Sequence, residues 1–212
     1  MTSSTPLQPN VQQRRAFWLR HLHQWHWISA AVSLMAMLLF AATGITLNHS
    51  ADIEAHPVVS KKSAQIPASL LATLTKKPAA ELALPLALRD WLAQNTAISV
   101  GQQSAEWSPK EVYVALPRPG GDAWLRIELD SGMLEYEKTE RGWIAYFNDL
   151  HKGRNTGGAW AWFLDFFAVA CLIFCLTGLF LLQMHAGNRP ATWPVVALGL
   201  VLPLLLAIVF IH

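Results

Sequence analysis

The chain has 212 residues, of which 53% are hydrophobic and only 14% are charged. Soluble proteins average roughly 25% charged residues, so the composition excludes an ordinary soluble enzyme and indicates a membrane protein. The formal net charge of +2 is too small to indicate a nucleic-acid partner. The two cysteines lie four residues apart in one apolar run, which excludes a disulfide framework.

Three apolar stretches predict three transmembrane helices. The first runs from Trp27 to Leu47 without a charge, and its 21 residues, at about 1.5 Å each, span a hydrocarbon core of about 30 Å. The second runs from Trp160 to Met184 and contains one charge, Asp165. The third runs from Val195 to Ile211, and Pro203 inside it should kink it. The length of the first stretch, and of the chain before it, favours an uncleaved anchor over a signal peptide.

Basic residues in the short flanks predict the orientation. Arg14, Arg15 and Arg20 precede the first stretch and Arg189 lies between the second and third, so these flanks should face the cytoplasm. The C-terminus then lies on the far side of the membrane. The predicted organisation is a cytoplasmic N-terminal segment (1–24), helix one (25–47), a far-side domain (48–158), helix two (159–184), a cytoplasmic loop (185–194) and helix three (195–212).

The segment between helices one and two is long enough for a small α+β domain. Two stretches read as helices, Ser69 to Lys77 and Ala80 to Gln94, the second interrupted by Pro85. Alternating residues predict two strands, Glu111 to Pro117 and Ala123 to Asp130, and the turn at Asp130-Ser-Gly132 leads into a third, Met133 to Thr139, which completes an antiparallel meander. A short amphipathic helix from Gly142 to Leu150 should lead back to the membrane, with Trp143 and Tyr146 suited to the interface. This domain carries no metal motif, nucleophile elbow or phosphate loop, and reads as a binding or spacing module.

Six of the eight histidines lie at the ends of the two long spans. His21, His23 and His26 lie at the cytoplasmic start of span one, and His185 lies at the cytoplasmic end of span two. His49 and His151 lie at the outer ends of the same two spans. Each membrane face is therefore expected to receive histidines from both helices.

A short repeat relates the two spans. Leu22-His23 opens the first and Thr43-Gly44 closes it, while Leu150-His151 precedes the second and Thr177-Gly178 closes it. Since the two spans run in opposite directions, an inverted pair would bring the exit of one beside the entry of the other. Helical phase puts His26 on the face of Gly44, and His185 on the face of Gly178, where a flat macrocycle could pack on a residue without a side chain.

Paired imidazoles at both edges of a membrane favour haem b, whose iron takes axial histidines and whose ring is buried by apolar side chains. We expect two haems, one held by His26 and His185 and one held by His49 and His151. His23, one turn from His26, is an alternative ligand. Zinc suits the pattern less, because its sites usually carry more ligands.

His56, His212 and Asp165 also have possible roles that involve no cofactor. A single histidine at a helix end is usually an interfacial residue, and we interpret His56 and His212 as a loop residue and a terminus. Asp165 is the one charge within a span, and such residues are costly and usually functional. It would bond a haem propionate, a ligand histidine or a partner hydroxyl, or pass a proton, unless it simply reaches the interface.

These residues carry a family resemblance. The segments Leu22-His23-Gln24-Trp25-His26-Trp27, Thr43-Gly44-Ile45-Thr46-Leu47-Asn48-His49, Asp149-Leu150-His151-Lys152-Gly153-Arg154 and Thr177-Gly178 resemble the PepSY-associated transmembrane helix family in its short three-span form. The resemblance implies a Gram-negative inner-membrane protein with a PepSY-like periplasmic domain. Larger members look like haem-containing reductases of ferric siderophores, and short ones resemble parts of flavin-linked electron-transfer systems. It also implies that His23 or His26 serves an inner haem and His151 an outer one.

The sequence therefore predicts an α-helical integral membrane protein with three transmembrane helices and a small α+β periplasmic domain. Its expected function is dihaem electron transfer from the cytoplasmic or quinol side to a ferric chelate or a periplasmic redox protein. Fewer spans than in the larger reductases favour completion by a homodimer or another membrane redox subunit within the lipid. The alternatives are a non-redox adaptor, whose domain binds a periplasmic protein or peptide, and a transporter or metal-handling subunit.

Overall fold

The computed structural model of the chain describes residues 11–74 and 83–211. Three of its helices are long and apolar enough to cross a membrane, namely α1 (Val11–Asn48), α5 (Gly158–His185) and α6 (Thr192–Phe210). A single 3₁₀ turn, η1 (Ala186–Asn188), follows α5. By helix length and apolar composition, the prediction of three membrane-spanning helices is confirmed. Contacts divide the chain into two compact units, residues 1–38 with 163–212 and residues 39–162, and each is described by itself.

The helix α1 is much longer than the apolar stretch that predicted it. Its 38 residues correspond to about 57 Å at 1.5 Å per residue, against a hydrocarbon core of about 30 Å. Residues 11–24, expected only as a segment outside the membrane, belong to the same helix. The helix α6 continues through Pro203.

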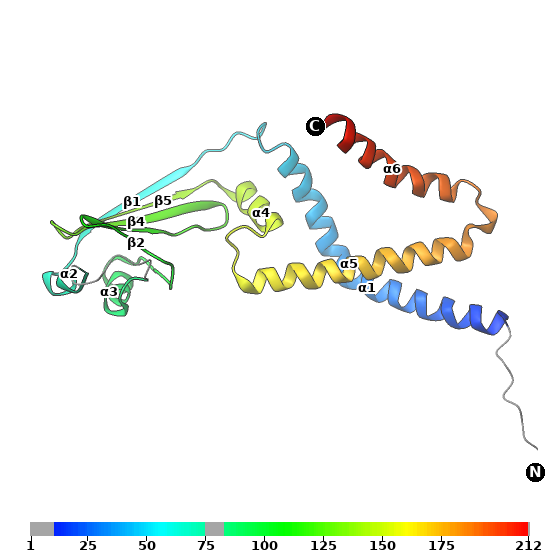
Figure 1. Ribbon diagram of the computed structural model, residues 1–212, viewed down its shortest axis with the longest axis horizontal. Coiled ribbons are helices and arrows are strands. Elements are labelled where there is room, and N and C mark those ends of the chain that lie inside the picture. Colours follow the sequence, from blue (N-terminus) through cyan, green and yellow to red (C-terminus); the bar gives the residue numbers. More distant parts are fainter. Residues whose placement is uncertain (1–10, 75–82, 212) are drawn as a thin grey trace, which may run out of the picture. The chain divides into compact units, whose positions relative to one another are not determined.

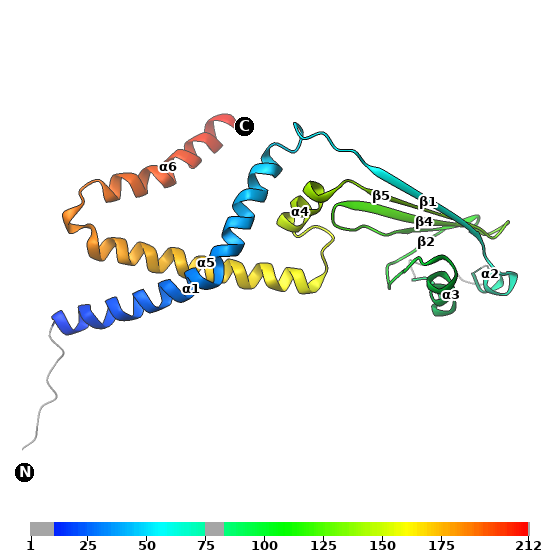
Figure 2. The ribbon, with the colours of Figure 1, turned by 180° about the vertical axis from the view of Figure 1, so that it is seen from behind.

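Small and polar residues line the contact between α1 and α5 in the first unit. Ser29 and Ser33 on α1 are buried, as is Ala170 on α5. Both serine hydroxyls donate to carbonyls of α1 itself, Ser29 to Trp25 at 2.7 Å and Ser33 to Ser29 at 2.7 Å. Hydroxyls satisfied in this way, together with small side chains, let two apolar helices approach closely. The two helices cross in both ribbon views (Figures 1 and 2).

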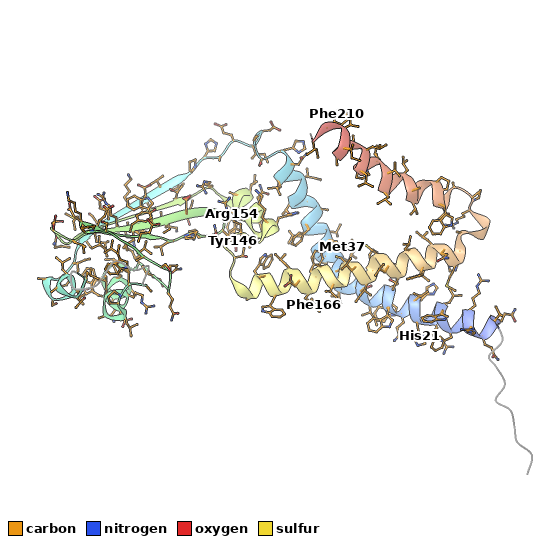
Figure 3. The ribbon with its side chains drawn as sticks, viewed as in Figure 1. His21, Met37, Tyr146, Arg154, Phe166 and Phe210 are labelled. Atoms are coloured by element: carbon orange, nitrogen blue, oxygen red, sulfur yellow. The ribbon has the colours of Figure 1, made fainter. Side chains whose placement is uncertain are left out.

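Most other side chains of the long helices are exposed apolar groups. No residue of α6 is buried within the described part of the chain, and its side chains up to Phe210 project freely (Figure 3). Such a surface would be a liability in water, but it is what a hydrocarbon solvent requires.

The second unit contains a five-stranded antiparallel sheet with the strand order β1-β5-β4-β3-β2. Its strands are β1 (Val58–Gln65), β2 (Glu106–Trp107), β3 (Glu111–Ala115), β4 (Gly121–Glu128) and β5 (Met133–Glu140). Two helices, α2 (Ala68–Leu74) and α3 (Leu86–Thr96), lie on one face of the sheet (Figure 1). An α+β domain was therefore correctly predicted.

Strict alternation along the central strands creates the core of this domain. In β4, Leu125 and Ile127 are fully buried while Arg126 between them is exposed. The buried face meets leucines from both covering helices, including Leu74, Leu88 and Leu92. This is the pattern of an antiparallel sheet that has one packed face and one open face.

The structure adds two strands to the three that the sequence predicted. The edge strand β1 is exposed at almost every position and carries Lys61 and Lys62, so it shows no apolar alternation. The strand β2 has only two residues. The helix expected from Ala80 to Gln94 instead begins after Pro85, as α3, while residues 75–82 lie outside the described part.

The short helix α4 (Trp143–Lys152) is fixed to the turn between β3 and β4. The backbone N–H of Gly120 donates to Oδ2 of Asp149 at 2.9 Å, in a buried position. Gly120 has a φ of 73°, and a Cβ placed there would lie 2.8 Å from Cα of Tyr146. Only glycine combines this left-handed conformation with so close an approach to α4.

We predict that Gly120→Ala lowers the midpoint of thermal unfolding of the full chain in detergent by several degrees. The new methyl group would push the turn away from Tyr146 and weaken the bond to Asp149, an overpacking cost of about 1–3 kcal/mol. Gly157→Ala is the matched control, because Gly157 also has a positive φ, 80°, but no atom lies within 4 Å of its added Cβ. Equal losses in the two variants would contradict the docking of the turn on α4.

Candidate functional site: two histidines seated on Thr-Gly pairs

In the first unit, the half-buried His26 of α1 lies against α5. Its Nδ1 is 3.0 Å from the hydroxyl oxygen of Thr177 and 3.2 Å from the carbonyl oxygen of Phe174. The ring stacks on Phe174, with centroids 4.5 Å apart and an interplanar angle of 17°. A Cβ on Gly178 would come within 3.2 Å of Cε1 of His26, so the ring rests where α5 lacks a side chain.

In the second unit, His151 of α4 lies against α1 in the same way. Its Nδ1 is 2.7 Å from the hydroxyl oxygen of Thr43, and its ring lies 4.9 Å from that of Phe40. A Cβ on Gly44 would lie 3.6 Å from Cε1 of His151. The two histidines therefore have the same three neighbours: a threonine hydroxyl, a glycine and a phenylalanine ring.

The threonine hydroxyls determine which ring nitrogen carries hydrogen. Thr177 donates to the carbonyl of Ile173 at 2.7 Å, and Thr43 donates to that of Leu39 at 2.9 Å. A hydroxyl has one hydrogen, so when that hydrogen is on the backbone carbonyl, the threonine oxygen accepts from histidine. In this arrangement Nδ1 carries the proton and Nε2 carries the lone pair that could bind a metal ion. For His26 the carbonyl oxygen of Phe174, 3.2 Å from Nδ1, favours the same tautomer, because a carbonyl can only accept.

This geometry extends the sequence repeat and shows that His26, not His23, contacts the Thr177-Gly178 pair. Each Thr-Gly pair is preceded by phenylalanine at the same spacing, Phe40 before Thr43 and Phe174 before Thr177, a signal that the sequence analysis did not use. The counterpart of His151 is His26, not His23, although His23 shares the preceding leucine. Each Thr-Gly pair therefore contacts a histidine from another helix.

The other described histidines are arranged differently. Nδ1 of each donates to a carbonyl of its own helix, four residues earlier, at 2.8–3.1 Å in His21, His23, His49 and His185. The rings of His23 and His185 lie 6.2 Å apart, almost perpendicular to each other. No contact joins His49 to His151 in the described residues. His56 is exposed, and His212 lies outside the described part.

An apolar hollow of about 530 Å³ joins His26 to His185 within the first unit. Its wall is otherwise Phe174, Gly178, Cys175 and three leucines of α5. Its volume is in the range of small-molecule and cofactor sites, roughly 300–1,000 Å³. The sequence-predicted residues His26, Gly178 and His185 therefore share one hollow.

The motif that contains His151 also anchors its own helix. Asn148 and Asp149 are both buried, and Oδ1 of Asn148 accepts a 2.8 Å hydrogen bond from Thr46 of α1. Oδ1 of Asp149 lies 3.7 Å from Nε of Arg154, and Gly153 ends α4 in a left-handed conformation. Tyr146 and Arg154 lie at this helix in Figure 3. The sequence did not predict Asn148 and Asp149 as positioning residues, although both directly precede Leu150-His151.

The donor set fits haem in type. Each candidate ligand is an imidazole whose Nδ1 is already bonded, and haem iron takes one or two such ligands beside apolar and aromatic side chains. No group of three or more His, Cys, Asp or Glu side chains comes together among the residues that the structure describes. Asp165 is exposed on α5 and has no hydrogen bond or ion pair with another described residue.

Three apolar helices and an intervening α+β domain define a membrane protein with a domain outside the spans. The family model described as PepSY_TM-like matches residues 17–212. The chain therefore belongs to the PepSY-associated transmembrane family, as its histidine and Thr-Gly segments led us to expect. No curated protein and no solved structure matches the chain.

We predict that Thr43→Val changes the state of the His151 ring. Without the hydroxyl acceptor, the Nδ1–H loses its partner, so ¹⁵N NMR of histidine-labelled full-length protein should show a shifted Nδ1 signal and some Nε2-protonated tautomer. The lost helix–helix bond should also cost about 0.6–1.7 kcal/mol. Thr73→Val is the control, because Thr73 is an exposed residue of α2 whose hydroxyl donates to the carbonyl of Leu70 and bonds no histidine among the described residues. An unchanged His151 signal in Thr43→Val would exclude this bond.

Proposed function

We propose that this protein is a dihaem b electron-transfer protein of the bacterial inner membrane. It would pass electrons from the cytoplasmic or quinol side to a periplasmic acceptor, in ferric-siderophore or other iron reduction. The observation that supports the proposal is that His26 and His151 have equivalent surroundings: each has Nδ1 bonded to a threonine, and neither Nε2 has a hydrogen-bond partner among the described residues. A histidine that only joined two helices would not need both a glycine beneath its ring and an aromatic ring against it.

His26 and His185 would hold one haem and His151 and His49 the other. The shared apolar hollow supports the first pair. The second pair rests on the equivalent surroundings of His151 and on the position of His49 just after α1. Bound haem would supply one-electron redox chemistry at these positions.

The chain's own residues would orient and tune these ligands. Thr177 and Thr43 hold the imidazoles in one tautomer, and a hydrogen bond at Nδ1 makes Nε2 a better donor to iron. Gly178 and Gly44 keep the helix surface flat beside each ring. Phe174 and Phe40 exclude water from one side of the imidazole.

The hollow beside His26 is open, so one protomer would leave much of a haem uncovered. Lipid, a second copy of the chain or another membrane redox subunit would complete the enclosure. A homodimer is the simplest of these, because α6 presents an unpartnered apolar surface within the described residues. The electron donor would be a separate molecule, since the sequence contains no nicotinamide or flavin motif.

The orientation proposed here follows the basic flanks. Arg15 lies near the end of α5 in the first unit, where its Nη2 donates to the carbonyl of Met184 at 3.1 Å. The arginine-rich start of α1 and the end of α5 would then face the cytoplasm together. The α+β domain and the C-terminus would face the periplasm.

We predict that a reporter active only in the periplasm is active when it is fused after His212. Alkaline phosphatase supplies the periplasmic signal, and a green fluorescent protein fusion at the same position should be dark after export. Reversed signals would place the C-terminus in the cytoplasm and contradict the proposed orientation.

We predict that His26→Ala and His151→Ala each remove or convert a different b-type haem. Groups at opposite ends of a span of about 30 Å share no ligand, so the other haem should keep its spectrum and potential. Redox titration of the purified variants measures each component. His56→Ala is the control and should keep both haems. Loss of the same component in both variants would replace the two-haem proposal by a single-haem site.

A further inference from the structure

A second hollow of about 530 Å³ lies in the α+β domain, away from the imidazole of His151. Four segments border it: the chain before and at the start of β1, the β3–β4 turn, the end of β5 and the first turn of α4. The side chains that decide its chemistry are His56, Arg118, Glu140, Trp143 and Tyr146. None of them takes part in the proposed haem ligation.

One wall of this hollow is aromatic. Trp143 and Tyr146 contact each other edge to face, with ring centroids 5.9 Å apart and an interplanar angle of 81°. Trp143 is 76% exposed, so much of its ring is free to contact a ligand. A flat aromatic molecule gains most from such a wall, through offset or edge-to-face stacking.

The rim carries more positive than negative charge. Glu140 is the carboxylate of this hollow, and Nζ of Lys138 contacts it at 2.7 Å, whereas Arg118 lies 3.6 Å away. The hydrogen bond from Lys138 holds the pKa of the Glu140 carboxyl below its usual value, so this group is ionised at neutral pH. Lys138 and Arg118 therefore form ion pairs with the same carboxylate, so these three groups together carry one positive charge. The guanidinium of Arg118 and the imidazole of His56 both border the hollow.

The hollow is also held in a fixed shape. The turn that carries Arg118 is docked on α4 through the bond from Gly120 to Asp149, and the same helix supplies both aromatic rings. Arg141, next to Glu140, has its backbone N–H bonded to the carbonyl of Gly120 at 2.9 Å and its side chain bonded to Asp122. Cation and rings are thus held together before any ligand arrives, which reduces the entropic cost of binding.

We propose that this hollow is a binding site for a flat aromatic anion, with its ring against Trp143 and Tyr146 and its negative oxygens on Arg118. A planar guanidinium matches the geometry of a carboxylate or a comparable oxyanion, and the aromatic wall selects against aliphatic acids. The inference does not depend on haem, so it stands or fails separately from the proposed function.

The test uses the full chain, in detergent and in nanodiscs of phosphatidylethanolamine and phosphatidylglycerol, with naphthalene-2-carboxylate as the probe. Equilibrium dialysis should give saturable binding to one site per chain. The neutral naphthalene-2-carboxamide should bind about tenfold more weakly, since loss of one charge-assisted contact costs roughly that factor. The aliphatic cyclohexanecarboxylate keeps the charge but cannot stack on the rings, so it should bind severalfold more weakly.

Two matched pairs of variants localise the site. Arg118→Gln should weaken binding about tenfold, while Arg126→Gln, which removes a similarly exposed arginine paired with Glu135 on the sheet, should not. Trp143→Ala should weaken binding severalfold, while Trp162→Ala should not, although Trp162 is equally exposed at 78%. Equal effects within either pair would overturn the proposal. Binding seen in detergent but lost in nanodiscs would also overturn it, because lipid would then be what covers Trp143.

Discussion

The same kind of hydrogen bond, from histidine Nδ1 to a threonine hydroxyl, constrains the chemistry of both His26 and His151. Each threonine donates its only hydrogen to a carbonyl of its own helix, so it can meet histidine only as an acceptor. In this arrangement the imidazole is protonated at Nδ1, and Nε2 carries the lone pair. For His26 the carbonyl of Phe174 favours the same tautomer, whereas for His151 the threonine is the hydrogen-bond partner of Nδ1 among the described residues.

Helix α1 contributes residues to the surroundings of both histidines. The helix carries His26 for one seat and Phe40, Thr43 and Gly44 for the other, so it takes part in both. Polar side chains in an apolar helix are costly unless they are bonded, and Ser29, Ser33 and Thr43 all donate to carbonyls of α1 itself. They therefore add little cost in hydrocarbon, yet they keep the helix surface narrow where α5 or α4 approaches.

The short helix α4 connects the seat of His151 with the α+β domain. One end contributes Trp143 and Tyr146 to the hollow, and Asp149 near the other end holds the β3–β4 turn beside it. Since Asn148 and His151 both bond to threonines of α1, the domain is attached to that helix through side chains as well as through the chain itself. Replacing Asp149 would disturb the turn and the helix together.

Much of this arrangement could be predicted from the sequence, because the signals were periodic. Apolar length predicted the three spans, alternation predicted β3 and β4, and the turn after β4 predicted β5. The strand β1 has no alternation, since an edge strand with lysines buries neither face, and its pairing with β5 depends on residues far along the chain. The Thr-Gly repeat pointed to these contacts, but that His26 rather than His23 contacts Thr177 depends on the crossing of α1 and α5. Pairing of His49 with His151 and of His185 with His26 at one iron stays a prediction.

The most direct test of the central claim is a reduced-minus-oxidised visible spectrum of the purified wild-type protein from haem-replete cells, with haem quantified per chain. Imidazole ligation at both seats predicts sharp low-spin b-type bands and close to two haems per chain. A colourless preparation that is folded and monodisperse would contradict the account, and would leave the histidines as bonds between helices in a membrane-anchored adaptor.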